Sequence, residues 1–182
     1  MKNAIIFGGS GGGGLLTMGN MLARCALDCG KHVSDLPSYT GVKRGGFSST
    51  LVVIDDREIL SPMAELVGVF VAMDIVGYKK FIDSLEPGGI LFYDSSRIPA
   101  ESVVRTDIKV IAVPASDIAV ELGAGNGANI VMLGVLVGLT GIVPGDVMAA
   151  TIDKTFRHKS EKVRDMNALS FRRGLEIAGD FK

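Results

Sequence analysis

Six glycines and one serine follow directly after a short apolar run near the start of the chain. The apolar run covers residues 3–7 and the glycine segment, GGSGGGG, covers residues 8–14. Glycine inside a helix or strand costs about 0.5–1 kcal/mol relative to alanine, so such a run suits a sharp turn or a close approach. Apolar residues then recur at helical steps over Leu15–Cys29, and Gly30 follows at a C-cap position. The pattern predicts a buried strand, a glycine loop and a helix.

The glycine loop fits the dinucleotide-binding pattern G-x-G-x-x-G, and it stands between the predicted strand and helix as that pattern requires. The amino end of the helix would offer free N–H groups to an anion such as a pyrophosphate. Asp35 follows Gly14 by about 20 residues and is the candidate to bind a ribose. No Gly-Lys-Ser/Thr follows, which excludes a nucleoside-triphosphate P-loop. From spacing alone, the glycines of the loop either bind a ligand or only allow close packing.

Composition narrows the class of protein. The 182 residues include 19 basic and 20 acidic side chains, and this balance argues against nucleic-acid binding. Hydrophobic residues make up 47%, which indicates that a partner covers part of the surface. The apolar stretch 128–143 is shorter than the roughly 20 residues of a membrane span and is expected to be a buried or interface helix. No signal peptide is evident, so a cytoplasmic location is expected.

Strand and helix patterns alternate along the chain. After the first helix, strands are expected at 32–36, 47–54, 57–60, 68–73, 90–93 and 109–113, with 47–54 and 57–60 forming a hairpin and a turn at 87–89. Helices are expected at 78–85, 116–122 (capped by Ser116), 126–139, 145–156 and 159–178. This alternation predicts a three-layer α/β/α sandwich with a Rossmann-like mixed, mostly parallel sheet and a helical C-terminal part.

We expect one domain over residues 1–182, with an α/β core over about 1–157 and a C-terminal helix over about 158–182. That last helix is charged and only partly apolar, which suggests that it projects and docks elsewhere. Cys25 and Cys29 are the only cysteines and are expected to be small core residues, because a zinc or iron–sulfur site needs more ligands.

Five motifs, in order, resemble those of the gamma subunits of 2-oxoacid:ferredoxin oxidoreductases. The first motif resembles G-x-G-G-Q-G and comprises Gly9, Gly11, Gly12 and Gly14. The second motif resembles P-S-Y-x-x-x-x-R-G-G and comprises Pro37, Ser38, Tyr39, Arg44, Gly45 and Gly46. The third motif is Ile59-Leu60-Ser61-Pro62, which is similar to I-x-S-P. The fourth is Pro87-Gly88-Gly89 with Tyr93-Asp94-Ser95, which is similar to a P-G-G strand entry. The fifth is Asn129 with Leu133-Gly134, which is similar to N-x-x-x-L-G. Together they cover about residues 4–145. Gly13 departs from the pattern, because it stands where the family has glutamine.

The resemblance implies a non-autonomous subunit of an enzyme that oxidatively decarboxylates a 2-oxoacid to an acyl-CoA. In that family, alpha and beta subunits, with a delta subunit in some complexes, carry thiamine diphosphate, Mg²⁺ and iron–sulfur clusters, and the electrons pass to ferredoxin. This chain would bind no cofactor firmly and would be inactive alone. It would contribute to assembly and to the coenzyme A or active-site cavity.

The site residues that the resemblance implies form two groups. The glycine loop, either a cofactor-binding loop or an interface, comprises Gly9, Gly11, Gly12 and Gly14. Contacts to coenzyme A or to another subunit are expected from Ser38, Tyr39, Arg44, Gly45, Gly46 and Asn129. No catalytic residue and no metal ligand is expected. The alternatives are a free-standing dinucleotide-binding oxidoreductase or ligand sensor that uses Asp35, and a purely structural subunit whose glycine loop only packs.

Overall fold

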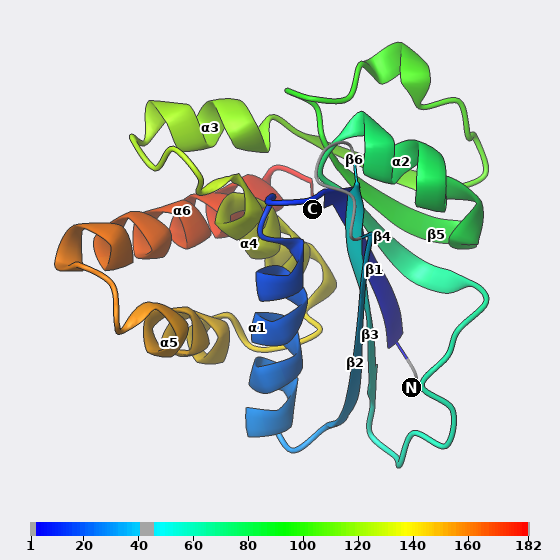
Figure 1. Ribbon diagram of the computed structural model, residues 1–182, viewed down its shortest axis with the longest axis horizontal. Coiled ribbons are helices and arrows are strands. Elements are labelled where there is room, and N and C mark those ends of the chain that lie inside the picture. Colours follow the sequence, from blue (N-terminus) through cyan, green and yellow to red (C-terminus); the bar gives the residue numbers. More distant parts are fainter. Residues whose placement is uncertain (1–2, 41–45, 182) are drawn as a thin grey trace.

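The computed structural model describes residues 3–40 and 46–181. The strands are β1 (Asn3–Ser10), β2 (His32–Tyr39), β3 (Phe47–Asp55), β4 (Val67–Ala72), β5 (Leu85–Asp94) and β6 (Lys109–Val113). The α-helices are α1 (Leu15–Asp28), α2 (Ile75–Phe81), α3 (Ala115–Glu121), α4 (Ala128–Thr140), α5 (Gly145–Phe156) and α6 (Glu161–Gly179). Figure 1 shows α1, α4, α5 and α6 on one side of the sheet and α2 on the other.

The six strands form one mixed sheet in the order β2-β3-β1-β4-β5-β6. β1, β4, β5 and β6 run parallel to one another, whereas β3 is antiparallel to both of its neighbours, β1 and β2. The predicted mixed α/β fold is therefore confirmed. The hairpin predicted between 47–54 and 57–60 is wrong: residues 57–60 form no strand. β3 already pairs along both edges, so no edge is left for another strand.

Two apolar layers hold the helices on the sheet. Alternate residues of a strand point to opposite faces. In β1, Ile5 and Phe7 therefore join the core beneath α1 and α4, whereas Ala4 and Ile6 face the smaller cluster beneath α2. The smaller cluster also takes in residues of the segment 95–108, including Ile98. This arrangement is the three-layer sandwich that the alternation predicted, with the larger core on the α1 face.

Two local predictions need correction. The turn expected at 87–89 lies inside β5, where the pairing with β4 shifts register between Val67 and Val69 and where Gly88 has a φ of 79°. Residues 87–89, which the sequence predicts as a turn, are therefore an irregular part of the strand. Ser116 is not an N-cap, because α3 begins at Ala115 after Pro114 and Ser116 lies in its first turn. Its hydroxyl donates instead to Asp94 at the end of β5.

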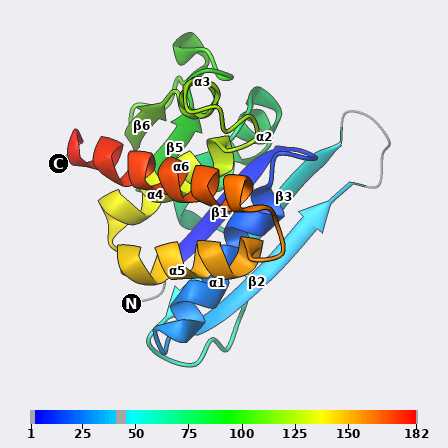
Figure 2. The same cartoon turned by 90° about the vertical axis from the view of Figure 1, so that its left-hand side faces the viewer.

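The last helix does not project from the molecule as expected, because α6 packs along α4 (Figure 2). The two helices meet at glycines: a Cβ on Gly174 would lie 2.9 Å from the Cα of Gly134 and closer still to the carbonyl oxygen of Val131. Small residues let the two backbones approach. Because glycine is only weakly hydrophobic, the sequence pattern of α6 does not indicate that this face is buried. α4 itself is buried over Asn129–Val137, as expected for an all-apolar helix. None of the described helices is both long and apolar enough to cross a membrane.

Candidate functional site

The sheet changes its direction of winding between β1 and β4. The helix after β1, α1, packs on one face, and the helix after β4, α2, packs on the other. The chain then continues to β2 on one side of this point and to β5 on the other. In open α/β sheets, ligands bind outside the carboxyl ends of the strands at such a switch point. The glycine loop after β1 lies at that position.

Asp74 ties the glycine loop to the start of α2. It is the N-cap of α2, and its Oδ1 accepts hydrogen bonds from the backbone N–H groups of Val76 and Gly77, each at 3.0 Å. Its Oδ2 accepts from the backbone N–H of Ser10 at 2.6 Å. One carboxylate therefore satisfies a helix amino end and holds the first residue of the loop. Sequence reasoning did not single out Asp74, although an aspartate after an apolar strand and before a helix is a capping signal.

Two glycine loops face one cleft of about 740 Å³ at the carboxyl edge of the sheet. The first contributes residues 10–14 and opens α1; the second, GAGNG at 123–127, opens α4. Neither helix has a side-chain cap at its amino end. Gly14 has a φ of 72°, and Asn129 leaves no room for a Cβ there. The two uncapped helix starts therefore meet beside Gly14 and Asn129, and both offer backbone N–H groups to an anion.

Charged side chains give the cleft an excess of positive charge. In the part of the chain that the structure describes, the cations that line it are Arg97, Lys159 and Lys162. Among the described residues that line the cleft, Asp74 is the only carboxylate, and both of its oxygens are already hydrogen-bonded to backbone N–H groups. The helix amino ends add further positive partial charge. The electrostatics of the cleft favour an anionic ligand.

The structure brings most of the predicted site residues to one edge of the sheet. Gly11, Gly12, Gly14 and Asn129 line the cleft, together with Gly13. Gly9 lies in β1, where a Cβ would lie 3.1 Å from the side chain of Leu15 and 3.2 Å from that of Asp74. Close packing is therefore the role of Gly9 in the fold.

The described part of the second motif borders the first motif and is not among the residues that line the cleft. The backbone N–H of Gly11 donates to the carbonyl oxygen of Gly46 at 3.2 Å. Ser38 and Tyr39 end β2 at the same edge of the sheet, and Tyr39 is 71% exposed. Arg44 and Gly45 lie outside the described residues. The described part of this motif therefore forms an exposed rim next to the glycine loop.

Asp35 does not belong to the cleft. It lies in the middle of β2, pairs with Val52 of β3, and accepts a hydrogen bond from the hydroxyl of Thr50. β3 separates β2 from β1, so the acidic residue expected next to the loop is displaced by a whole strand. The dinucleotide hypothesis therefore loses the residue that would have bound the ribose.

The two cysteines differ in their surroundings. Cys25 is buried in the core, as predicted, whereas Cys29 at the end of α1 is partly exposed. Burial, the largest effect, raises the pKa of the Cys25 thiol to about 11. In the part of the chain that the structure describes, no three His, Cys, Asp or Glu side chains gather as a metal-binding group.

These surroundings predict that only one thiol reacts quickly in the folded chain. At pH 8, iodoacetamide should label Cys29 fast and Cys25 only after unfolding, because thiolate is the reactive form and Cys25 is both protonated and buried. Mass spectrometry of timed samples measures this order. The C29S variant should lose the fast label. Equal rates at both positions would contradict the buried placement of Cys25.

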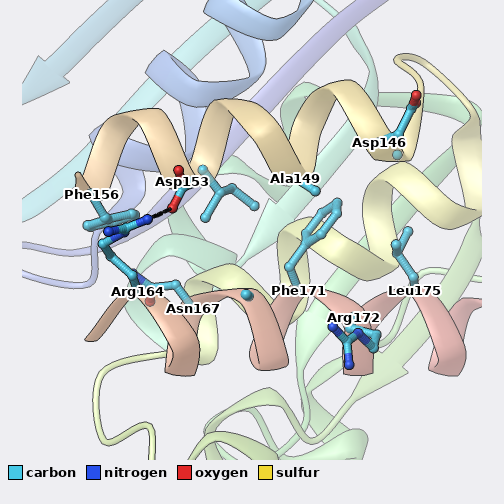
Figure 3. A pocket seen from close by; sticks show the side chains of 12 residues that line it. Asp146, Ala149, Asp153, Phe156, Arg164, Asn167, Phe171, Arg172 and Leu175 are labelled. Carbon is cyan, nitrogen blue, oxygen red and sulfur yellow. Dashed lines mark hydrogen bonds and ion pairs between the residues drawn. The ribbon is translucent and has the colours of Figure 1, made fainter. Parts of the chain in front are cut away.

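A second cavity, of about 250 Å³, lies between α5 and α6 (Figure 3). Its walls are largely apolar, with Ile152, Phe171 and Leu175 among them. At one end, Arg164 pairs with Asp153 at 2.8 Å. Phe156 and Asn167 line both this cavity and the cleft. The two cavities therefore share a wall. Among the described residues, the second cavity is lined by two acidic and two basic side chains (Asp146, Asp153, Arg164 and Arg172), so it lacks the positive excess of the cleft.

Comparisons with known proteins agree with this class of open α/β sheet. The family model described as pyruvate ferredoxin/flavodoxin oxidoreductase matches residues 4–177. The ketoisovalerate oxidoreductase subunit VorA of Methanothermobacter thermautotrophicus is 39% identical over 172 residues, which are 93% of this chain and 35% of that protein. The 2-oxoglutarate synthase subunit KorC of Methanocaldococcus jannaschii is 33% identical over 181 residues, covering 98% of this chain and 95% of that protein. The chain thus spans about a third of VorA and nearly all of KorC.

Solved structures show the same fold. The keto/oxoacid ferredoxin oxidoreductase gamma subunit from Geobacter sulfurreducens matches with a TM-score of 0.81 at 27% identity, over 98% of this chain and 99% of that one. The 2-oxoglutarate:ferredoxin oxidoreductase from Magnetococcus marinus, whose structure contains 2-oxoglutarate, coenzyme A and succinyl-CoA, matches with a TM-score of 0.90. This second match covers 100% of this chain and 32% of that one, and at 22% identity it concerns the fold alone.

The chain belongs to the pyruvate ferredoxin/flavodoxin oxidoreductase family, because the family model covers nearly its whole length. The resemblance drawn from the five motifs is confirmed, and it is supported over the free-standing dinucleotide-binding module.

Proposed function

We propose that this chain is the gamma subunit of a cytoplasmic, multi-subunit 2-oxoacid:ferredoxin oxidoreductase, and that its cleft binds the phosphates of coenzyme A. The chain is one domain of that complex and has no activity alone. Partner alpha and beta subunits, with a delta subunit in some complexes, carry thiamine diphosphate, Mg²⁺ and the iron–sulfur clusters, and ferredoxin accepts the electrons.

The observation that carries this proposal is the cleft between the two glycine loops. Coenzyme A has a diphosphate and a ribose phosphate. The cleft has two uncapped helix starts and, among the described residues, three cations. The bare backbone of residues 11–14 allows a diphosphate to approach the N–H groups closely. Asn129, whose amide lies beside Gly14, contributes a polar contact at the point where the helices meet. A cleft of about 740 Å³ can hold a ligand of this size.

The rim beside the glycine loop is the proposed subunit contact. Tyr39 is 71% exposed at the end of β2, and tyrosine is enriched at protein interfaces. Ser38 and Gly46 flank it at the same edge, and the motif continues into Arg44 and Gly45. The high apolar content of the chain also agrees with a surface that partners cover. The glycine loop would then bind its ligand next to an interface.

The test is affinity purification of the tagged chain from its own source, grown without oxygen. We expect thiamine-binding and cluster-bearing polypeptides to co-purify, with CoA-dependent viologen reduction by one or more 2-oxoacids. The Y39A variant should fold normally but recover at least several-fold less partner, because an interface aromatic is lost. A Y78F variant, altered at a buried tyrosine of α2, is the matched control. A wild-type chain that purifies without such partners would refute the proposal.

A further inference from the structure

A buried carboxylate stands at the carboxyl end of β5, next to the cleft. Asp94 is the last residue of β5 and its side chain is 0% exposed. Its Oδ1 accepts from the backbone N–H groups of Ser96 at 3.1 Å and Ser116 at 3.3 Å. Its Oδ2 accepts from the hydroxyl of Ser116 at 2.5 Å. A buried carboxylate needs such donors, and here they come from the next loop and from α3.

The hydroxyl of Ser116 determines the direction of the chain of hydrogen bonds. A serine hydroxyl has one proton to donate, and this proton goes to Asp94. Its oxygen therefore acts as the acceptor for Nε of Arg97, which lies 2.9 Å away. Arg97 Nε is also 4.0 Å from Oδ2 of Asp94. Asp94 thus holds Ser116, and Ser116 holds Arg97.

The other end of Arg97 is available to a ligand. Its side chain is 61% exposed and lines the cleft together with Ser116. Among the described residues, no partner is found for its two terminal nitrogens, since its hydrogen bond and ion pair both use Nε. The distal edge of a guanidinium presents parallel N–H groups that match two oxygens of a phosphate. A flexible surface arginine would lose side-chain entropy on binding, whereas one held at Nε has already lost part of it.

We infer that Asp94 and Ser116 are positioning residues that hold Arg97 as the phosphate-binding arginine of the cleft. This inference rests on the proposed function, because it assigns one part of the coenzyme A site. It adds a specific recognition group from the segment after β5 to the non-specific attraction of the helix starts. Nothing in the five sequence motifs indicated Arg97 or Ser116 as a site residue.

The experiment compares acyl acceptors with and without phosphates in the assembled complex. In the wild type, coenzyme A should have a much lower KM than pantetheine, which lacks all phosphates. The R97Q variant should raise the KM for coenzyme A about tenfold, the size expected for a charge-assisted hydrogen bond, with kcat little changed. Its KM for pantetheine should change less than twofold. The R173Q variant removes an arginine that pairs with Glu176 on α6, outside the cleft, and should match the wild type.

Variants at Ser116 separate positioning from simple structure. S116A removes the acceptor for Arg97 and should raise the KM for coenzyme A severalfold, again without a matching change for pantetheine. S116T keeps a hydroxyl at the same position and should restore the wild-type KM. If R97Q leaves the preference for coenzyme A over pantetheine intact, or if S116A behaves like S116T, the inference is wrong. If the wild-type complex itself shows no preference, the proposed role of the cleft fails instead.

Discussion

Replacing Gly174 with alanine is expected to lower the free energy of unfolding by about 3 kcal/mol, the upper part of the range for overpacking. The new Cβ would lie 2.9 Å from the Cα of Gly134 and closer still to the carbonyl oxygen of Val131. Both obstacles are backbone atoms of α4, so a rotamer change cannot relieve them. α6 would have to move away from α4 and give up the burial of Phe171 and Ile177. Urea denaturation followed by circular dichroism measures the loss.

Gly179 provides a control in the same helix. A Cβ there meets no atom of the described residues within 4 Å, and the φ of Gly179 is not positive. G179A should therefore leave the protein unchanged or stabilise it by about 0.4–1 kcal/mol, because alanine restricts the unfolded chain. Equal effects at the two positions would show that the contact between α4 and α6 does not determine the effect of the substitution at Gly174.

Removing the carboxylate of Asp74 is expected to have the second-largest effect, since D74A leaves three backbone N–H groups without their acceptor. The groups belong to Val76 and Gly77 at the start of α2 and to Ser10 at the start of the glycine loop. Loss of an N-cap alone costs about 0.5–2 kcal/mol, so a total near 2 kcal/mol is expected. The KM of the complex for coenzyme A should also rise, because the loop is no longer tied to the sheet edge. Thermal unfolding and steady-state kinetics measure the two effects.

The D74N variant separates the two roles of Asp74, which are to cap α2 and to hold the glycine loop. An asparagine keeps one carbonyl oxygen, which can still accept from Val76 and Gly77 and cap α2. Its amide nitrogen cannot accept from the N–H of Ser10, so only the link to the loop is broken. We expect D74N to retain most of the stability while raising the KM for coenzyme A about as much as D74A. A D74N variant with wild-type KM would show that the glycine loop keeps its shape without this link.

Several elements could be predicted because their signals are local. The apolar run, the glycines and the helical spacing of residues 3–29 correspond to β1, the loop and α1. The helix expected at 145–156 is α5 with the same bounds. Two predictions, the turn at 87–89 and the projecting last helix, were wrong because the signals there are not local. Pairing with β4 and close contact with α4 outweigh local preference in those segments.

The candidate site, too, could be predicted only where its signals are local. By itself, the sequence determined the glycine loop, its helix, the order of elements and, through the five motifs, the family. Only the tertiary structure decided that β3 separates β2 from β1, which takes Asp35 away from the loop. It also brought residues 10–14 together with 123–127, and Asp94 together with Ser116 and Arg97. The physical reason is that hydrogen bonds between strands and contacts between loop ends join residues far apart in the chain, and periodicity records only the face that each element buries.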